Sequence, residues 1–131
     1  MSVVQLNVFD EPLELCSNDP LTGFTRNGCC SSHEKDHGDH FVCSSVTEKF
    51  LKFSLGKGND LITPNPSFNF KGPKPGDKWC LCTSRWIESL KNDVAPKVYL
   101  KSTNKLVLEK INLVILKKFA PLFMVGSRLL P

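Results

Sequence analysis

Residues 75–91 read Pro-Gly-Asp-Lys-Trp-Cys-Leu-Cys-Thr-Ser-Arg-Trp-Ile-Glu-Ser-Leu-Lys and combine two closely spaced cysteines with an apolar pattern of helical period. Positions i, i+3, i+7 and i+11 share one face of a helix, and here they are Trp79, Cys82, Trp86 and Leu90. Asp77 is a favourable N-cap residue. The segment therefore predicts a helix over about residues 79–91 that packs its indoles into a core.

A second helix is predicted between Ser45 and Gly58. Ser45 and Glu48 have the spacing of a capping box, in which Ser45 is the N-cap. A helical apolar face follows, and Gly56 or Gly58 ends the helix. The shorter predicted elements are a strand at 4–8, a strand at 98–100, a strand or helical turn at 106–108, and a short helix capped by Asn112 and ended by Pro121.

These elements lack the strict strand–helix alternation of parallel α/β proteins. The expected fold is α+β, a single compact domain over residues 1–131 with a small mixed or antiparallel sheet, two main helices and long ordered loops. Residues 16–39 form a polar loop with cysteines near both ends, and loops of this length are usually functional. Residues 59–78 carry four prolines and are expected to be an ordered loop, and residues 121–131 are a short apolar tail.

Composition narrows the class of protein. The net charge is +4, and the lysines are dispersed rather than gathered in a basic stripe with interleaved aromatics, which argues against nucleic-acid binding. No apolar stretch approaches the length of a transmembrane helix, so no membrane association is expected. The N-terminus has no secretory signal pattern. A cytoplasmic location is therefore expected, where reducing conditions disfavour disulfides and favour free, catalytic or metal-bound thiols.

All six cysteines lie in the first 82 residues, together with three histidines within eight residues. Zinc takes four cysteine or histidine ligands, usually as two close pairs brought together by the fold. The spacings here match no standard zinc finger or ribbon. We nevertheless predict a metal site, with zinc as the first choice, whose ligands are a subset of Cys16, Cys30, His40, Cys43, Cys80 and Cys82.

Thiol chemistry is the alternative. Cys80 would lie in the first turn of the predicted helix at 79–91, where the helix dipole stabilises a thiolate. Cys43 and His40 form a possible nucleophile–base pair three residues apart, so the catalytic candidates of a redox or nucleophilic enzyme are Cys80, Cys43 and His40. A third interpretation is that the cysteines have no chemical function and pack as small hydrophobic side chains in the core.

Two further kinds of binding are compatible with the sequence. Arg85 lies between Trp79 and Trp86 and could stack on an indole while it holds the anionic group of a small ligand. A metal-free interaction domain would instead use the proline-rich loop, or would self-associate through the apolar C-terminal tail.

Several short strings together resemble a family of small uncharacterised bacterial proteins, domain of unknown function 2237, over about residues 6–120. The most specific is the run from Pro75 to Trp86; the others include Pro20-Leu21-Thr22-Gly23-Phe24, Gly28-Cys29-Cys30, His40-Phe41-Val42-Cys43 and Gly58-Asn59-Asp60-Leu61.

The resemblance implies no reaction, cofactor or partner. It does imply that the six candidate ligands above are motif positions of the family, and that His33 and His37 are not. Asn27 stands where the family usually has Asp, and Asp10 where it usually has Gly. The function stays open among a metal-binding protein, a thiol enzyme and an interaction domain, with metal binding ranked first.

Overall fold

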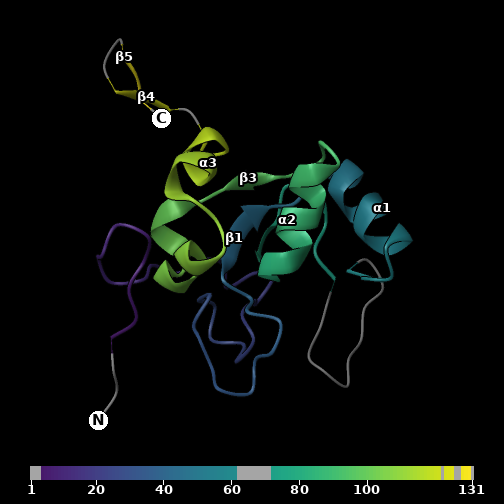
Figure 1. Cartoon of the computed structure of the whole chain (residues 1–131), viewed down its shortest axis with the longest axis horizontal. Coiled ribbons are helices and arrows are strands. Elements are labelled where there is room, and N and C mark those ends of the chain that lie inside the picture. The colour runs from purple at the N-terminus through teal and green to yellow at the C-terminus, as the bar shows by residue number, and fades with distance from the viewer. Residues whose placement is uncertain (1–3, 62–71, 122, 126–127, 131) are drawn as a thin grey trace.

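The computed structural model describes residues 4–61, 72–121, 123–125 and 128–130. Its centre is a three-stranded antiparallel sheet in the order β2-β1-β3, formed by β1 (Val42–Ser45), β2 (Lys78–Leu81) and β3 (Lys97–Val98). Three helices surround it (Figure 1): α1 (Glu48–Gly56), α2 (Thr83–Lys91) and α3 (Leu113–Lys118). The predicted α+β class is confirmed, and the sheet is antiparallel.

Residues 78–81 correct the prediction of a helix beginning near Trp79. They form β2, which pairs along its whole length with β1, so that Val42 faces Leu81 and Cys43 faces Cys80. The helix begins only at Thr83, with Cys82 in the N-cap position and no side-chain cap. Asp77 instead accepts a hydrogen bond from the backbone of Lys74. Pairing with a strand that begins 36 residues earlier outweighs the local helical pattern, which holds only from Thr83 onward.

The helix predicted between Ser45 and Gly58 is confirmed with a later start. Ser45 belongs to β1, and the N-cap of α1 is Thr47, whose hydroxyl accepts a hydrogen bond from the Phe50 amide at 3.0 Å. The helix ends at Gly56, one of the two predicted positions. In α3 the predicted cap is confirmed, because the Asn112 side chain accepts a hydrogen bond from the amide of Val114.

Two of the short predicted elements take other forms. Residues 4–8 form isolated bridges rather than a strand, since Leu6 pairs with Pro12 and Asn7 with Asn104. The predicted strand or helical turn at 106–108 is a 3-10 helix, η3 (Lys105–Glu109), which follows a shorter one, η2 (Leu100–Ser102). Asp10 has a φ of 63°, in the left-handed region that favours glycine.

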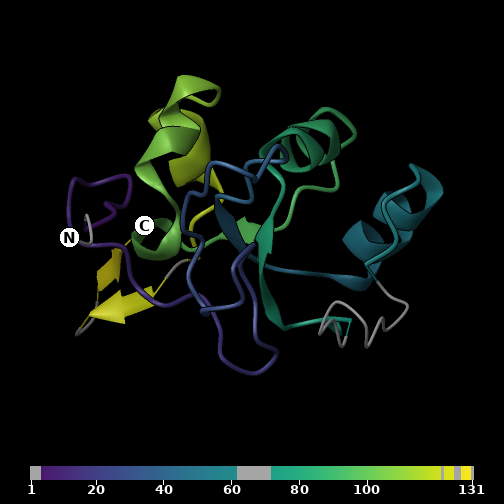
Figure 2. The same cartoon turned by 90° about the horizontal axis from the view of Figure 1, so that it is seen from below.

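Side chains alternate between the two faces of a strand, and both faces of the β1–β2 pair are buried. Val42, Trp79 and Leu81 point into a hydrophobic core that also contains Trp86 of α2 and Leu116 of α3. The opposite face carries the cysteines of the two strands, which meet cysteines of the polar N-terminal loop. Seen from below, this loop (blue) overlies the sheet between α3 on one side and α1 and α2 on the other (Figure 2).

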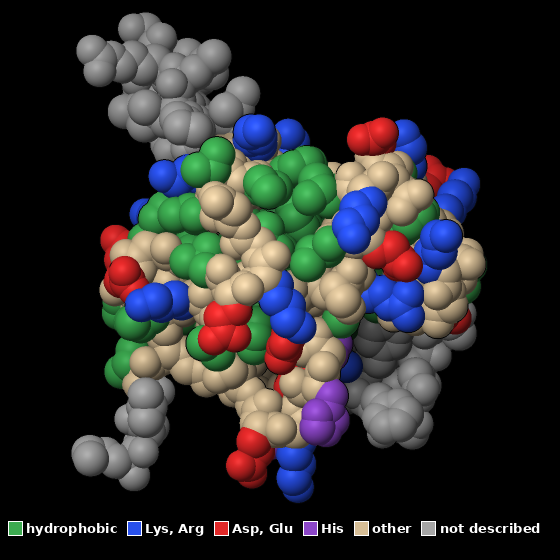
Figure 3. All heavy atoms as spheres, viewed as in Figure 1, with side chains coloured by type: hydrophobic (Ala, Val, Ile, Leu, Met, Phe, Trp, Pro, Cys, Tyr) green, Lys and Arg blue, Asp and Glu red, His purple; other side chains and the backbone are tan. Residues whose placement is uncertain are grey.

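Some predictions lie outside the described residues. The loop at 62–71, and the side chains of residues 122–131 on which self-association would depend, are among them. The tail backbone contains an antiparallel pair, β4 (Phe123–Val125) and β5 (Arg128–Leu130). Among the described residues, no helix has the length and apolar character needed to cross a bilayer. On the face seen in Figure 3, Lys and Arg side chains lie among acidic and hydrophobic ones.

Candidate functional site

Four cysteines from three separate segments meet on one face of the sheet. Cys16 and Cys30 come from the N-terminal loop, Cys43 from β1 and Cys80 from β2, and each side chain is at most 4% exposed. Two disulfides join them, Cys16–Cys43 and Cys30–Cys80, with Cα–Cα distances of 5.8 and 5.3 Å. The sulfur atoms of Cys16, Cys30 and Cys80 lie within 4.8 Å of one another, so the two bridges are in contact. We call these four residues the sulfur cluster.

Hydrogen bonds to the backbone hold each member of the sulfur cluster in place. The hydroxyls of two buried threonines accept from the strand cysteines: Thr103 from the Cys43 amide at 3.2 Å and Thr22 from the Cys80 amide at 2.8 Å. In the loop, the Cys16 amide donates to the Gly28 carbonyl, and the Asn104 side chain donates to the Cys30 carbonyl at 3.0 Å. The sulfur atoms therefore sit on a fixed polar frame.

Glycine is required where the loop approaches the cluster. Gly28 has a φ of 87° and Gly23 a φ of 95°, both in the region that other residues rarely adopt. A Cβ atom on Gly23 would collide with the carbonyl oxygen of Cys29, and one on Gly28 would lie 2.5 Å from the Leu15 side chain. These positions allow the loop to fold back tightly enough to bring Cys16 and Cys30 together.

The disulfides correct the expectation of free or metal-bound thiols throughout the chain. That expectation rested on a cytoplasmic location, whereas the Cα–Cα distances of both pairs lie in the normal range for a disulfide. Cys80 and Cys43, the predicted nucleophiles, are bonded in this state and have no thiol to react. Cys80 also lies inside β2 rather than in the first turn of a helix.

His40 lies apart from the sulfur cluster. Its Nδ1 atom is 2.7 Å from the buried carboxylate of Asp36, which also accepts hydrogen bonds from the amides of Gly38 and His40. The ring of Phe24 is stacked on His40, with a centroid distance of 6.2 Å. Because Asp36 occupies Nδ1, the remaining ring nitrogen, Nε2, is the one available for another partner.

The two cysteines outside the disulfides are Cys29 and Cys82, both partly exposed. Cys82 immediately precedes α2, and its sulfur is 3.2 Å from the Ser84 hydroxyl. Cys29 lies next to Cys30 in the loop, and burial raises the pKa of its thiol above the ordinary value. Neither belongs to the group of three sulfurs within 4.8 Å. Of the six candidate ligands, the fold therefore brings together four and leaves His40 and Cys82 outside.

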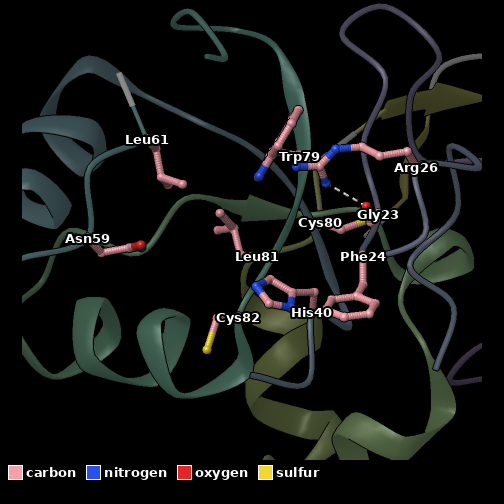
Figure 4. Close-up of a pocket in the computed structure, with 10 residues that line it drawn as sticks. All are labelled: Gly23, Phe24, Arg26, His40, Asn59, Leu61, Trp79, Cys80, Leu81 and Cys82. Atoms are coloured by element: carbon pink, nitrogen blue, oxygen red, sulfur yellow. Dashed lines mark hydrogen bonds between the residues drawn. The ribbon is translucent and has the colours of Figure 1, made fainter. Parts of the chain in front are cut away.

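His40 and Cys82 instead line a cavity of about 460 Å³ that also borders Cys80 (Figure 4). The carbonyl of Asp39 accepts hydrogen bonds from the amide and hydroxyl of Thr83, which fixes the His40 segment against the start of α2. Trp79 and Leu81 of β2 form one wall, and Phe24 lies beside His40. The cavity thus adjoins the sulfur cluster through the same strand.

Arg26 is the cation of this cavity, whereas the sequence suggested Arg85. The Arg26 guanidinium lies over the Trp79 ring at 5.4 Å, and its Nη1 donates to the Gly23 carbonyl at 2.6 Å. Its Nε is buried and has no hydrogen-bond partner among the described residues. Burial lowers the pKa of Arg26 from its ordinary value. Arg85 extends along α2 instead, where it contacts the Lys57 carbonyl and Glu88.

Sequence reasoning missed the residues that support both features. Thr22, Thr103 and Asn104 are polar residues that the fold buries, and nothing in their local sequence marks them as partners of cysteine. Arg26 is held at a φ of 56°, which is uncommon for a residue other than Gly, Asn or Asp. The contact of Arg26 with Trp79 depends on the tertiary fold and has no signal in the local sequence.

The model of the family described as "Uncharacterized protein conserved in bacteria (DUF2237)" matches residues 6–120, which is most of the chain. The chain belongs to this family, as the resemblance in its sequence indicated. No curated protein matches the chain significantly.

Proposed function

We propose that this member of the DUF2237 family binds one zinc ion through Cys16, Cys30, Cys43 and Cys80 when its two disulfides are reduced. The observation that carries the proposal is the convergence of four buried cysteines from one loop and two strands, with the sulfur atoms of three of them within 4.8 Å of one another. The fourth, Cys43, is covalently bonded to Cys16 and so lies beside them.

The distances between the sulfur atoms favour this site. Zinc–sulfur bonds of about 2.3 Å in a tetrahedron place the sulfurs about 3.8 Å apart. To reach that separation, the two sulfur atoms of each opened disulfide would move apart by just under 2 Å. Sulfur atoms of different bridges that are now up to 4.8 Å apart would move about 1 Å closer. Side-chain rotations over a fixed backbone can supply movements of this size.

The surroundings favour zinc once the bridges are open. Reduction of both bridges would remove the covalent links between the N-terminal loop and the strands β1 and β2. A zinc ion that binds the four thiolates would connect the loop to both strands again. Four thiolate ligands leave no open coordination position, which makes the role structural rather than catalytic.

The chemical balance of the step is simple. Opening both disulfides consumes four electrons and four protons, which two molecules of a dithiol reductant supply as each becomes a cyclic disulfide. The four resulting thiols lose four protons when they bind zinc, so zinc affinity falls as the pH falls. Two molecules of a small-molecule disulfide, each of which takes up two electrons and two protons to become thiols, would return the four thiolates to two disulfides and release the ion.

The test is a metal titration of protein that has been reduced without oxygen and purified without an affinity-tag metal. We expect one zinc per chain, and with cobalt(II) as a substitute we expect the absorption of a tetrahedral thiolate site. Before reduction, the protein should bind less than about a tenth of an equivalent.

Matched variants identify the ligands. Cys43→Ser and Cys80→Ser should weaken zinc binding by at least about tenfold, whereas Cys29→Ser removes a cysteine from the same loop and should leave it unchanged. His40→Gln and Cys82→Ser should also leave it unchanged, which separates the sulfur cluster from the other two predicted ligands. Reduced protein that binds no zinc, or that loses it on substitution of Cys82, would refute the proposal.

A further inference from the structure

We infer that the cavity between Arg26 and His40 is a binding site for a small organic carboxylate with a flat apolar body. This inference is independent of the zinc site. It rests on the shape and lining of the cavity and on the way its two basic side chains are held (Figure 4).

Arg26 is held in one position before any ligand arrives. Its backbone lies in the left-handed region, with a φ of 56°, and conformations of this kind are concentrated at functional sites. One guanidinium nitrogen is bonded to the Gly23 carbonyl, and the ring of Trp79 supports the planar group. A preorganised guanidinium loses little entropy when it binds an anion.

The Arg26 side chain still has unused hydrogen-bonding capacity. A guanidinium has five N–H donors. Its Nη1 donates to the Gly23 carbonyl, and its buried Nε has no partner among the described residues. A buried donor without a partner is costly, and a carboxylate relieves that cost because its two oxygens match the fork of the guanidinium. An anion is therefore the group that the Arg26 side of the cavity fits best.

His40 presents its second ring nitrogen on the same cavity. Its Nδ1 atom donates to the Asp36 carboxylate, so Nε2 is the nitrogen left for a ligand. In the neutral ring Nε2 is an acceptor, and it donates to a carboxylate only when the ring is protonated. The described residues that line the cavity include no Asp or Glu, so none of the lining side chains is a carboxylate that would compete for Arg26.

The remaining walls of the cavity fit a ligand that is flat and apolar apart from its carboxylate. The rings of Trp79 and Phe24 and the side chains of Leu61 and Leu81 line the cavity, with the Asn59 amide as a further polar group. A volume of about 460 Å³ lies in the range of small-molecule sites. Aromatic and aliphatic walls with a cation on one of them match an aromatic or other planar carboxylate.

The test is an NMR titration with three probes: benzoate, phenylacetate and indole-3-acetate, each up to 10 mM. We expect the Trp79 side-chain signal to shift in a saturable way for at least one probe. The signal of Trp86, which is 0% exposed in the core, should remain unchanged and serves as an internal reference. Benzamide, the neutral counterpart of benzoate, should bind at least about tenfold more weakly because it lacks the charge.

Variants then locate the binding. Arg26→Gln should weaken binding of the carboxylate probe at least about tenfold. The affinity of Arg26→Lys should lie between those of the unmodified protein and Arg26→Gln, because lysine keeps the charge but lacks the planar guanidinium. Arg85→Gln makes the same charge change on the surface of α2 and should bind as the unmodified protein does. Backbone spectra and the free-thiol count show that each variant is folded with both disulfides. The inference fails if no probe shifts Trp79, or if Arg26→Gln binds as well as Arg85→Gln.

Discussion

Replacement of Cys30 and Cys80 by alanine should lower the free energy of unfolding by about 4 kcal/mol. The two residues are 50 positions apart in the sequence, and bridging a loop of that length lowers the entropy of the unfolded chain by an amount worth about 4 kcal/mol at 25 °C. The same reasoning gives about 3.5 kcal/mol for the Cys16–Cys43 bridge, which spans 27 positions. The loops overlap, so the two values should not be summed.

The assay is chemical denaturation of the oxidised protein and of the double variant, followed by tryptophan fluorescence. A matched control replaces Cys29 and Cys82, the two unbonded cysteines, and should change the free energy of unfolding by less than about 1 kcal/mol. The slope against denaturant should also rise in the Cys30/Cys80 variant, because an unfolded chain with fewer cross-links exposes more surface.

Measurement under reducing conditions with a chelator separates the bridge from packing. Neither protein then contains a disulfide, so the difference of about 4 kcal/mol between them should largely disappear. A difference that persists unchanged after reduction would mean that the sulfur atoms stabilise the fold by packing alone, and it would refute the account based on loop length.

Two further predictions concern the neighbouring side chains. Because burial raises the pKa of the Cys29 thiol, its thiolate fraction at a given pH is smaller in the folded than in the unfolded protein. The rate of its alkylation by iodoacetamide, followed by peptide mass spectrometry, should therefore still increase with pH above about pH 9. A rate that reaches a plateau below about pH 8.5 would contradict this prediction. Asp36→Asn should cost about 2 kcal/mol in the free energy of unfolding, measured by denaturation, because the carboxylate accepts three hydrogen bonds and an amide presents donors to some of the same groups. Glu34→Gln makes the same charge change at an exposed position of that loop, and an equal loss there would show that charge alone is responsible.

Local signals predicted the elements whose stabilising groups are close in sequence. The helix α1 and the Asn112 cap of α3 depend on side chains that bind amides two or three residues away. β2 could not be predicted in this way, because its partner β1 is distant in sequence and the spacing of Trp79, Cys82 and Trp86 imitates a helix. Tertiary pairing therefore decided the one segment that positions both the cavity and half of the sulfur cluster.

The sequence located the cysteine-rich region correctly but contained no information on pairing. Six cysteines allow 15 complete disulfide connectivities, and spacing alone does not select among them. The antiparallel register of β1 and β2 places Cys43 opposite Cys80 without bonding them to each other. Each is bonded instead to a cysteine of the loop, so the pattern depends on where Gly23 and Gly28 allow that loop to turn.

The N-terminal loop contributes residues to both the sulfur cluster and the cavity. The Cys30–Cys80 bridge and the bond from the Cys80 amide to Thr22 attach the loop to β2, and the same loop carries Arg26 to the ring of Trp79 on that strand. Hydrogen bonds alone contribute about 1 kcal/mol each, which is little against the entropy of a polar loop. The two disulfides supply this stabilisation in the oxidised protein, and the proposed four-thiolate zinc site would supply it in the reduced protein. The cavity should therefore persist in both forms. In reduced protein without zinc, we expect Arg26 to lose its position over the Trp79 ring.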